Sequence, residues 1–206
     1  MPEYKSIYPP PYLSFYTAPY LEDLEDAKDY IRETIDDQGP FDGIIGFSQG
    51  CALAASMMLE DSPMSEIFRF GVFFCASLPF NKDDLGGKER WDVARKSQND
   101  PMGEFAGELG LSYCPTYPEG LEAVIHGRFH PARTPETFFS VPVLHVIGKQ
   151  DPFAKQSRLL SEMSEQNGSM VFEHGTGHEM PRDVGEKARI VEMISELIDR
   201  VTVPAA

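Results

Sequence analysis

FDGIIGFSQG, at residues 41–50, holds a serine between two glycines in the pattern G-x-S-x-G. Residues 41–45, with three large apolar side chains, predict a short buried strand, and the small residues within 51–59 predict a tightly packed helix. A serine at such a turn faces backbone N–H groups and the positive end of the helix dipole, which favour a developing negative charge. Glycines fit this turn because the strand and helix backbones approach closely, so flanking side chains would clash. We therefore interpret Ser48 as a candidate nucleophile, although glycine and serine also meet in ordinary turns.

The composition indicates one soluble domain without a nucleic-acid partner. With 206 residues, residues 1–206 are expected to form a single domain with its own core. A net charge of -15 leaves no excess of cations to neutralise phosphates. The N-terminus has no signal-peptide core, and no apolar run approaches the ~20 residues of a membrane span, so we expect a cytoplasmic protein. The three cysteines are irregularly spaced, which argues against a disulfide framework, and Cys51 and Cys75 lie in apolar runs and should be buried.

Helical and strand patterns alternate along the rest of the chain. Further strands are predicted at 70–76, 141–148 and 169–174, and helices at 20–37, 154–166 and 183–200. In the last helix the predicted apolar face consists of Ala188, Ile190, Val191, Ile194, Leu197 and Ile198. This alternation predicts an α/β fold with a doubly wound, mostly parallel sheet, in which sites lie at the carboxyl ends of the strands.

One segment departs from the alternation. Residues 79–140 lose periodicity and carry several prolines, so we interpret them as a loop-rich, lid-like insertion over the active-site end. A segment of this length is expected to contain short helices, for example near 119–126.

The strand ends supply partners for the serine. A serine hydroxyl needs a general base within hydrogen-bond reach, and the base needs an orienting acid. Asp151 follows the strand at 141–148, and His178 lies in a glycine-rich loop after the strand at 169–174. The chain order Ser, Asp, His is the order typical of α/β-hydrolases.

Other residues compete for the same roles. His174, at a strand end, is the rival base. Asp183 is the rival acid, although it falls where a helix-capping aspartate is common. His145 lies inside a strand and belongs to the core, whereas His126 and His130 lie in the insertion and would at most line a pocket.

Three segments resemble the fungal serine hydrolase (FSH) family of α/β-hydrolases. The resemblance is carried by residues 40–50, 143–151 and 175–181, with a further likeness at 14–16; it covers about residues 12–200 and is weakest in 80–138. It implies an enzyme that cleaves small esters or thioesters, with Ser48 as nucleophile, His178 as base and Asp151 as orienting acid. Some members of the family release polyketide acyl chains from carrier proteins in fungal secondary metabolism.

The chain departs from the family before the serine. Members begin with an apolar strand and a His-Gly loop that supplies the second oxyanion N–H, and nothing before Ser48 fits this description. The backbone N–H of Gln49 is the one oxyanion donor that the sequence identifies, and losing one donor typically costs ~10²–10³ in kcat. The strand before Ser48 would then have an unpaired edge. Three explanations stay open: an N-terminal truncation by gene model or isoform, which we favour; filling of the edge by residues 12–16; or a strand from a partner, as in a homodimer.

We expect a serine esterase or thioesterase acting on a small-molecule ester or acyl thioester, with an acyl carrier protein as a further partner. Two alternatives are a catalytically silent interaction protein on a degraded scaffold, and an acyltransferase or lyase that uses the same three residues. No metal-ligand spacing or phosphate-binding loop is apparent, so no cofactor or metal is expected.

The insertion gives two weak indications of the substrate. Its aromatic residues would line an acyl pocket or form a small core of their own; they are Phe105, Tyr113, Tyr117, Phe129, Phe138 and Phe139. Arg128 and Arg133, with the nearby histidines, form the one basic stretch, which would meet a phosphopantetheine or an acidic carrier, or would simply be a solvated loop.

Overall fold

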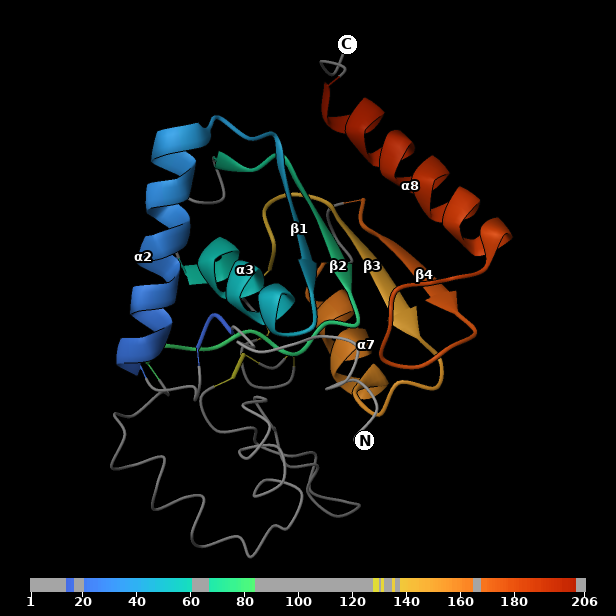
Figure 1. Ribbon diagram of the computed structural model, residues 1–206, viewed down its shortest axis with the longest axis horizontal. Helices are drawn as coiled ribbons and strands as arrows, with labels where there is room; N and C mark the ends of the chain where they lie inside the picture. Colours follow the sequence, from blue (N-terminus) through green and yellow to red (C-terminus); the bar gives the residue numbers. More distant parts are fainter. Residues whose placement is uncertain are drawn as a thin grey trace, which may run out of the picture.

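A parallel sheet forms the centre of the fold. The computed structural model describes residues 14–16, 21–60, 67–83, 128–129, 131, 135, 138–164 and 168–202. Its strands are β1 (Gly43–Phe47), β2 (Phe70–Phe74), β3 (Val143–Gly148) and β4 (Met170–His174), and its helices are α2 (Leu21–Gln38), α3 (Gln49–Glu60), α7 (Ala154–Glu162) and α8 (Val184–Thr202). The strands pair in the order β1-β2-β3-β4, all parallel (Figure 1). The predicted doubly wound α/β fold is confirmed.

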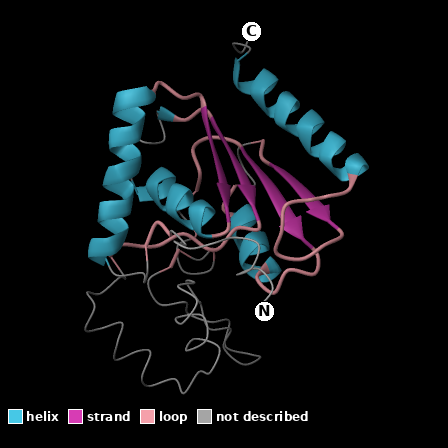
Figure 2. Ribbon diagram, in the orientation of Figure 1, coloured by secondary structure: helices cyan, strands magenta, loops and turns pink. Residues whose placement is uncertain are grey.

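Helices cover both faces of the sheet (Figure 2). On one face α3 packs against β1 and α7 against β3, with α2 outside α3; on the other face α8 packs against β2, β3 and β4. Successive side chains of β2 alternate between these layers, since Phe73 joins the core with Leu160 whereas Val72 joins the core with Leu197. Among the described helices, none has the length and apolar character needed to cross a bilayer.

The first strand is less buried than we expected. β1 starts at residue 43 rather than 41, and among the described strands it is the outermost and pairs with β2 alone. Ile45 is 64% exposed and Phe47 is 39% exposed, so the prediction of a buried strand was wrong. Residues 14–16 form no strand, so this part of the N-terminal segment does not fill the open edge.

Two helices differ from their predicted form. α7 ends at Glu162 instead of residue 166, because the N–H groups of Met163 and Ser164 bond to carbonyls three residues back in a tighter turn. α8 buries a narrow stripe consisting of Ile190, Met193 and Leu197. Our assignment of Ala188, Val191 and Ile198 to its buried face was wrong: all three are exposed, while Met193 takes their place.

The described part of the insertion belongs to the main core. Phe129 and Phe139 are buried among core residues of the α3 and α7 face, whereas Phe138 is exposed. Arg128 is only 4% exposed; its guanidinium lies 3.5 Å from the centre of the Phe80 ring and donates to the Leu78 carbonyl. The interpretation of Arg128 as a solvated or ligand-facing cation was therefore wrong.

Most other predictions for the insertion fall outside the described residues. They concern Phe105, Tyr113, Tyr117, His126, His130, Arg133 and the predicted helix near 119–126.

Candidate active site

The register of the sheet brings the predicted site residues together at the carboxyl ends of the strands. Phe47 at the end of β1 pairs with Phe74 at the end of β2, and Gly148 at the end of β3 pairs with His174 at the end of β4. Ser48, Asp151 and His178 all follow these aligned ends within four residues. Parallel strands end at the same edge, so three side chains far apart in the sequence meet there.

Ser48 occupies a sharp turn between β1 and α3. Its φ of 51° lies in the left-handed region, which is costly for a residue other than glycine. The turn is held by the Ser48 N–H, which donates to the Phe74 carbonyl over 2.9 Å, and by the Cys51 N–H, which donates to the Ser48 carbonyl over 3.1 Å. The strained turn keeps the Ser48 hydroxyl at the carboxyl end of β1.

The two glycines of the G-x-S-x-G motif differ in the space that a side chain would have. A Cβ at Gly46 would lie 2.9 Å from the backbone of Cys51, so the predicted clash is confirmed there. Among the described residues, the nearest neighbour of a Cβ at Gly50 would be the Phe15 ring at 3.8 Å. The predicted clash at Gly50 was wrong, because the helix backbone has already turned away from the strand at that position.

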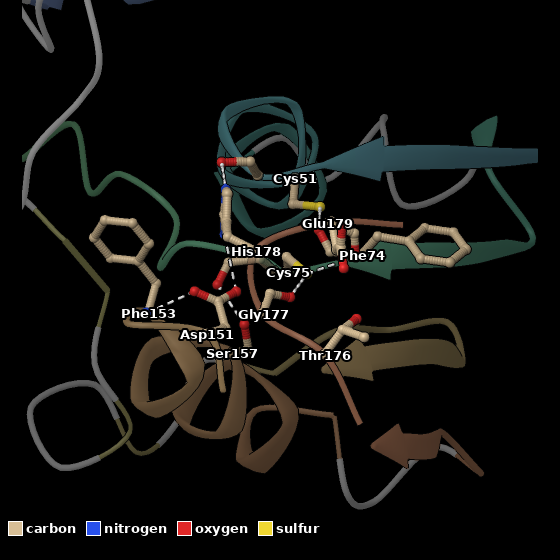
Figure 3. Close-up of polar contacts among 12 residues, drawn as sticks. Cys51, Phe74, Cys75, Asp151, Phe153, Ser157, Thr176, Gly177, His178 and Glu179 are labelled. Atoms are coloured by element: carbon tan, nitrogen blue, oxygen red, sulfur yellow. Dashed lines mark hydrogen bonds and ion pairs between the residues drawn. The ribbon is translucent and has the colours of Figure 1, made fainter. Parts of the chain in front are cut away.

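His178 links the serine to a carboxylate (Figure 3). Its Nε2 lies 2.8 Å from the Ser48 Oγ, and its Nδ1 lies 2.9 Å from the Asp151 Oδ2. The other carboxylate oxygen, Oδ1, accepts a hydrogen bond of 2.7 Å from the Phe153 N–H. The imidazole is thus held between a hydroxyl and a carboxylate, with each ring nitrogen in contact with one of them.

Asp151 is buried but charged. Its side chain is 0% exposed. Burial alone would raise the pKa of Asp151, but hydrogen bonds from His178 and from the Phe153 N–H hold that pKa below its ordinary value. A charged carboxylate requires a proton on Nδ1, which leaves Nε2 free to accept the hydroxyl proton of Ser48. The electrostatics therefore fix the tautomer that a general base needs.

Two aromatic rings flank the imidazole. The ring centre of Phe47 lies 5.2 Å and that of Phe153 5.4 Å from the His178 ring. These contacts limit rotation of the imidazole, whose side chain is still 28% exposed. Sequence reasoning missed both rings, although Phe47 lies inside the G-x-S-x-G stretch and Phe153 lies two residues after Asp151.

The rival residues serve other purposes. His174 is fully buried and its Nδ1 lies 2.8 Å from the Thr176 Oγ1, and Asp183 accepts a hydrogen bond of 2.9 Å from the Glu186 N–H at the start of α8. His145 lies in the core, as expected, with its Nε2 2.9 Å from the Ser164 Oγ. None of these three contacts reaches Ser48.

Gln49 ties an N-terminal segment to the site. It begins α3, so its backbone N–H lies in the first helical turn, beside the serine. Its side-chain amide accepts from the Phe15 N–H over 3.2 Å and donates to the Tyr16 carbonyl over 3.0 Å. This pair of hydrogen bonds, which the sequence did not predict, fixes residues 14–16 beside the turn.

A thiol completes the group. The Cys75 Sγ, the Asp151 carboxylate and the His178 imidazole lie within 4.8 Å of one another, a combination that also occurs in metal sites. Metal binding requires a thiolate, yet burial, followed by the charge of Asp151, raises the pKa of Cys75 to about 11. The chemistry of this donor set fits proton transfer better than metal binding.

Gly148 controls the spacing of the acid and histidine loops. A Cβ at this position would lie 2.2 Å from the Gly177 carbonyl oxygen and 2.9 Å from that of Thr176, both rigid backbone atoms. We expect Gly148→Ala to lower the free energy of unfolding by about 1–3 kcal/mol, measured by denaturant titration. The matched control is Gly50→Ala, whose new methyl has room and lies in a helix, so its stability should be equal or slightly higher. Equal stabilities for the two variants would contradict this account.

Comparison with known proteins shows which family and which proteins this chain resembles. Residues 12–190 match the family described as Serine hydrolase (FSH1). The esterase FPY3 of Fusarium mangiferae is 30% identical over 190 residues, which cover 88% of this chain and 69% of that protein. The hydrolase FUB4 of Fusarium oxysporum f. sp. lycopersici is 28% identical over 224 residues, covering 96% of this chain and 81% of that protein. A solved esterase structure from Pyrococcus furiosus aligns with a TM-score of 0.50 at 16% identity over 87% of this chain and 61% of that one, which supports the fold alone.

Proposed function

Because the chain belongs to the serine hydrolase (FSH1) family, we propose that it cleaves carboxylic esters or thioesters through an acyl-Ser48 intermediate. The observation that carries this proposal is the pair of contacts made by His178, 2.8 Å to the Ser48 Oγ and 2.9 Å to the Asp151 Oδ2. Few arrangements other than a nucleophile, its base and an orienting acid place a hydroxyl, an imidazole and a buried carboxylate in this order.

The first half of the reaction forms the acyl-enzyme. His178 Nε2 takes the proton of the Ser48 hydroxyl as the oxygen attacks the carbonyl carbon, and negative charge collects on the carbonyl oxygen. The Gln49 N–H, at the start of α3, is the donor that we assign to that oxyanion. The proton then passes from His178 to the leaving alcohol or thiol, and the acyl group stays on Ser48.

The second half regenerates the enzyme. Water attacks the acyl carbonyl, His178 takes a proton from this water, and the carboxylic acid leaves as the proton returns to the Ser48 oxygen. Throughout, the charge of Asp151 stabilises the transient imidazolium. The same residues would serve an acyltransferase if an alcohol or thiol replaced the water, so product analysis separates the two.

The substrate and partners are less defined. We propose a small ester or an acyl thioester, because these are the substrates that the family resemblance implies. An acyl carrier protein as thioester donor, a homodimer through the open edge of β1, and a single domain formed by residues 1–206 stay predictions. The buried position of Arg128 lends no support to a carrier-binding surface there.

A fluorophosphonate probe tests whether Ser48 is activated. We expect stoichiometric labelling, assigned to Ser48 by peptide mass spectrometry, because the neighbouring imidazole makes the hydroxyl nucleophilic. His178→Ala should abolish labelling, whereas His174→Asn, which removes the rival imidazole, should retain it in folded protein. Absence of labelling in a folded wild-type sample would favour a silent interaction protein instead.

A further inference from the structure

Cys75 lies between the two loops that carry Asp151 and His178. It follows β2 directly, as Ser48 follows β1, so the sheet register brings it to the same edge. Its thiol is 3.6 Å from the Glu179 carbonyl and 3.8 Å from the Gly177 carbonyl, the two residues that flank His178 (Figure 3). Its Sγ, a carboxylate oxygen of Asp151 and a ring nitrogen of His178 also lie within 4.8 Å of one another. One side chain thus contacts both loops of the site.

The backbone at this position is unusual. Cys75 has a φ of 49°, in the left-handed region, and Cys75 and Ser48 are the two non-glycine residues with positive φ in the described part of the chain. Strain of this kind persists only where the surrounding structure imposes it, and it gathers at functional sites. A glycine would adopt the same backbone without strain, so the side chain itself requires an explanation.

The protonation of the thiol explains its contacts. The side chain is 0% exposed, and burial raises the pKa of Cys75 to about 11, so the thiol keeps its proton at neutral pH. A neutral thiol has one proton to donate, and the carbonyl oxygens within its reach are those of Glu179 and Gly177, on either side of His178. Burial raises the pKa of Asp151, whereas His178, the Phe153 N–H and the nearby Cys75 thiol lower it.

We propose that Cys75 is a positioning residue, whose buried thiol holds the His178 loop beside the Asp151 carboxylate in the geometry of proton transfer. The inference rests on the proposed function, since it assigns Cys75 a part in the same site. It predicts an effect on kcat rather than on substrate affinity, because the thiol contacts the loop that carries the base and not the nucleophile. The titratable groups that face it are Asp151, His178, His174 and Cys51.

Steady-state hydrolysis of a p-nitrophenyl ester tests the proposal. Cys75→Ala should lower kcat about tenfold with KM within about twofold, because the thiol's hydrogen bonds to the loop that carries His178 are lost. The low-pH limb of the kcat/KM profile, which reports the hydrogen-bonded pair of Asp151 and His178, should move to higher pH, because the Cys75 thiol is among the groups that lower the pKa of Asp151. Cys75→Ser, which restores a donor, should return kcat to within about threefold of the wild type.

Two further variants separate positioning from packing. Cys51→Ala removes the other described buried thiol, which donates to the Phe74 carbonyl over 3.3 Å and is not part of the group formed by Cys75, Asp151 and His178. It should change kcat by less than about threefold and leave the low-pH limb in place. Cys75→Gly removes the side chain and relieves the positive φ, so it should stay folded yet lose kcat as the alanine variant does. Wild-type kcat and an unmoved limb in both Cys75→Ala and Cys75→Gly would overturn the proposal.

A proton NMR measurement, which needs no catalytic turnover, tests the role of Cys75 separately from the proposed hydrolase function. The Nδ1 proton of His178, shared with Asp151, gives a far-downfield proton NMR resonance whose position reports that hydrogen bond. It should shift in Cys75→Ala and stay in place in Cys51→Ala. A wild type that neither labels nor hydrolyses would refute the proposed function, whereas a resonance unmoved by Cys75→Ala would refute the role of the thiol.

Discussion

Ser48→Ala should lower kcat/KM for ester hydrolysis by at least about 10⁴-fold, because it removes the hydroxyl that His178 Nε2 contacts and that forms the acyl bond. The loss should appear in kcat, and the affinity for the ester should change little, since the methyl of alanine fills most of the same space. Stability should stay close to the wild type, because the turn is held by backbone hydrogen bonds that the substitution keeps. Initial rates with a p-nitrophenyl ester, together with a thermal melt, measure both quantities.

The matched control is a serine far from the site. Ser195 is exposed on α8, where its hydroxyl donates to the Val191 carbonyl over 3.0 Å, so Ser195→Ala should keep the wild-type rate. A Ser48→Ala variant that kept more than a few per cent of the activity would show that hydrolysis proceeds without an acyl-Ser48 intermediate. Activated water or another nucleophile would then have to be sought.

The three residues proposed for catalysis could be predicted because each carries a local signal. Ser48 lies in a glycine pattern between a strand and a helix, and Asp151 and His178 follow strands in the chain order of the α/β-hydrolases. The signal was sufficient because parallel strands all end at one edge, so position in the sequence translates into position in space. The rival residues His174 and Asp183 carry weaker signals and make other contacts.

Cys75 and Phe153 could not be recognised in the same way. Their importance depends on which strand pairs with which and on the approach of two loops, and neither is encoded in a short window. Cys75 was interpreted only as a buried apolar residue, which is correct for its exposure but misses its contacts. The strand predicted at 70–76 included Cys75, whereas β2 ends at Phe74, so the strand-end rule that found Asp151 did not single out Cys75.

Burial was predicted less well than secondary structure. Periodicity locates the apolar face of α8 but leaves its rotation uncertain by about one residue, so Val191 was chosen where Met193 is buried. The exposure of Ile45 depends on the place of β1 in the sheet order, which follows from pairing and not from composition. Arg128 was judged by its charge, whereas the aromatic ring of Phe80 and a backbone carbonyl accommodate that charge inside the core.

Asp151→Asn should lower kcat by about 10⁴-fold although the two side chains have nearly the same size and shape. The argument lies in the two acceptor roles of the carboxylate. Its Oδ1 accepts from the Phe153 N–H and its Oδ2 contacts His178 Nδ1. An asparagine has one acceptor oxygen, and the backbone N–H of Phe153, which always donates, will hold it. The amide NH₂ then faces Nδ1 and forces that nitrogen to accept, so the proton moves to Nε2 and the imidazole can no longer take the proton of Ser48.

The control for this variant is Asp183→Asn. Asp183 accepts from the Glu186 N–H at the start of α8, a capping role that asparagine fills equally well, so activity and stability should both stay within error of the wild type. The tautomer itself is measured by ¹⁵N NMR of His178: Asp151→Asn should convert the Nδ1–H form to the Nε2–H form, while Asp183→Asn should not. Should Asp151→Asn keep both the wild-type tautomer and the wild-type rate, the carboxylate would have no orienting role, and the hydrogen bond of 2.9 Å between Asp151 and His178 would be structural only.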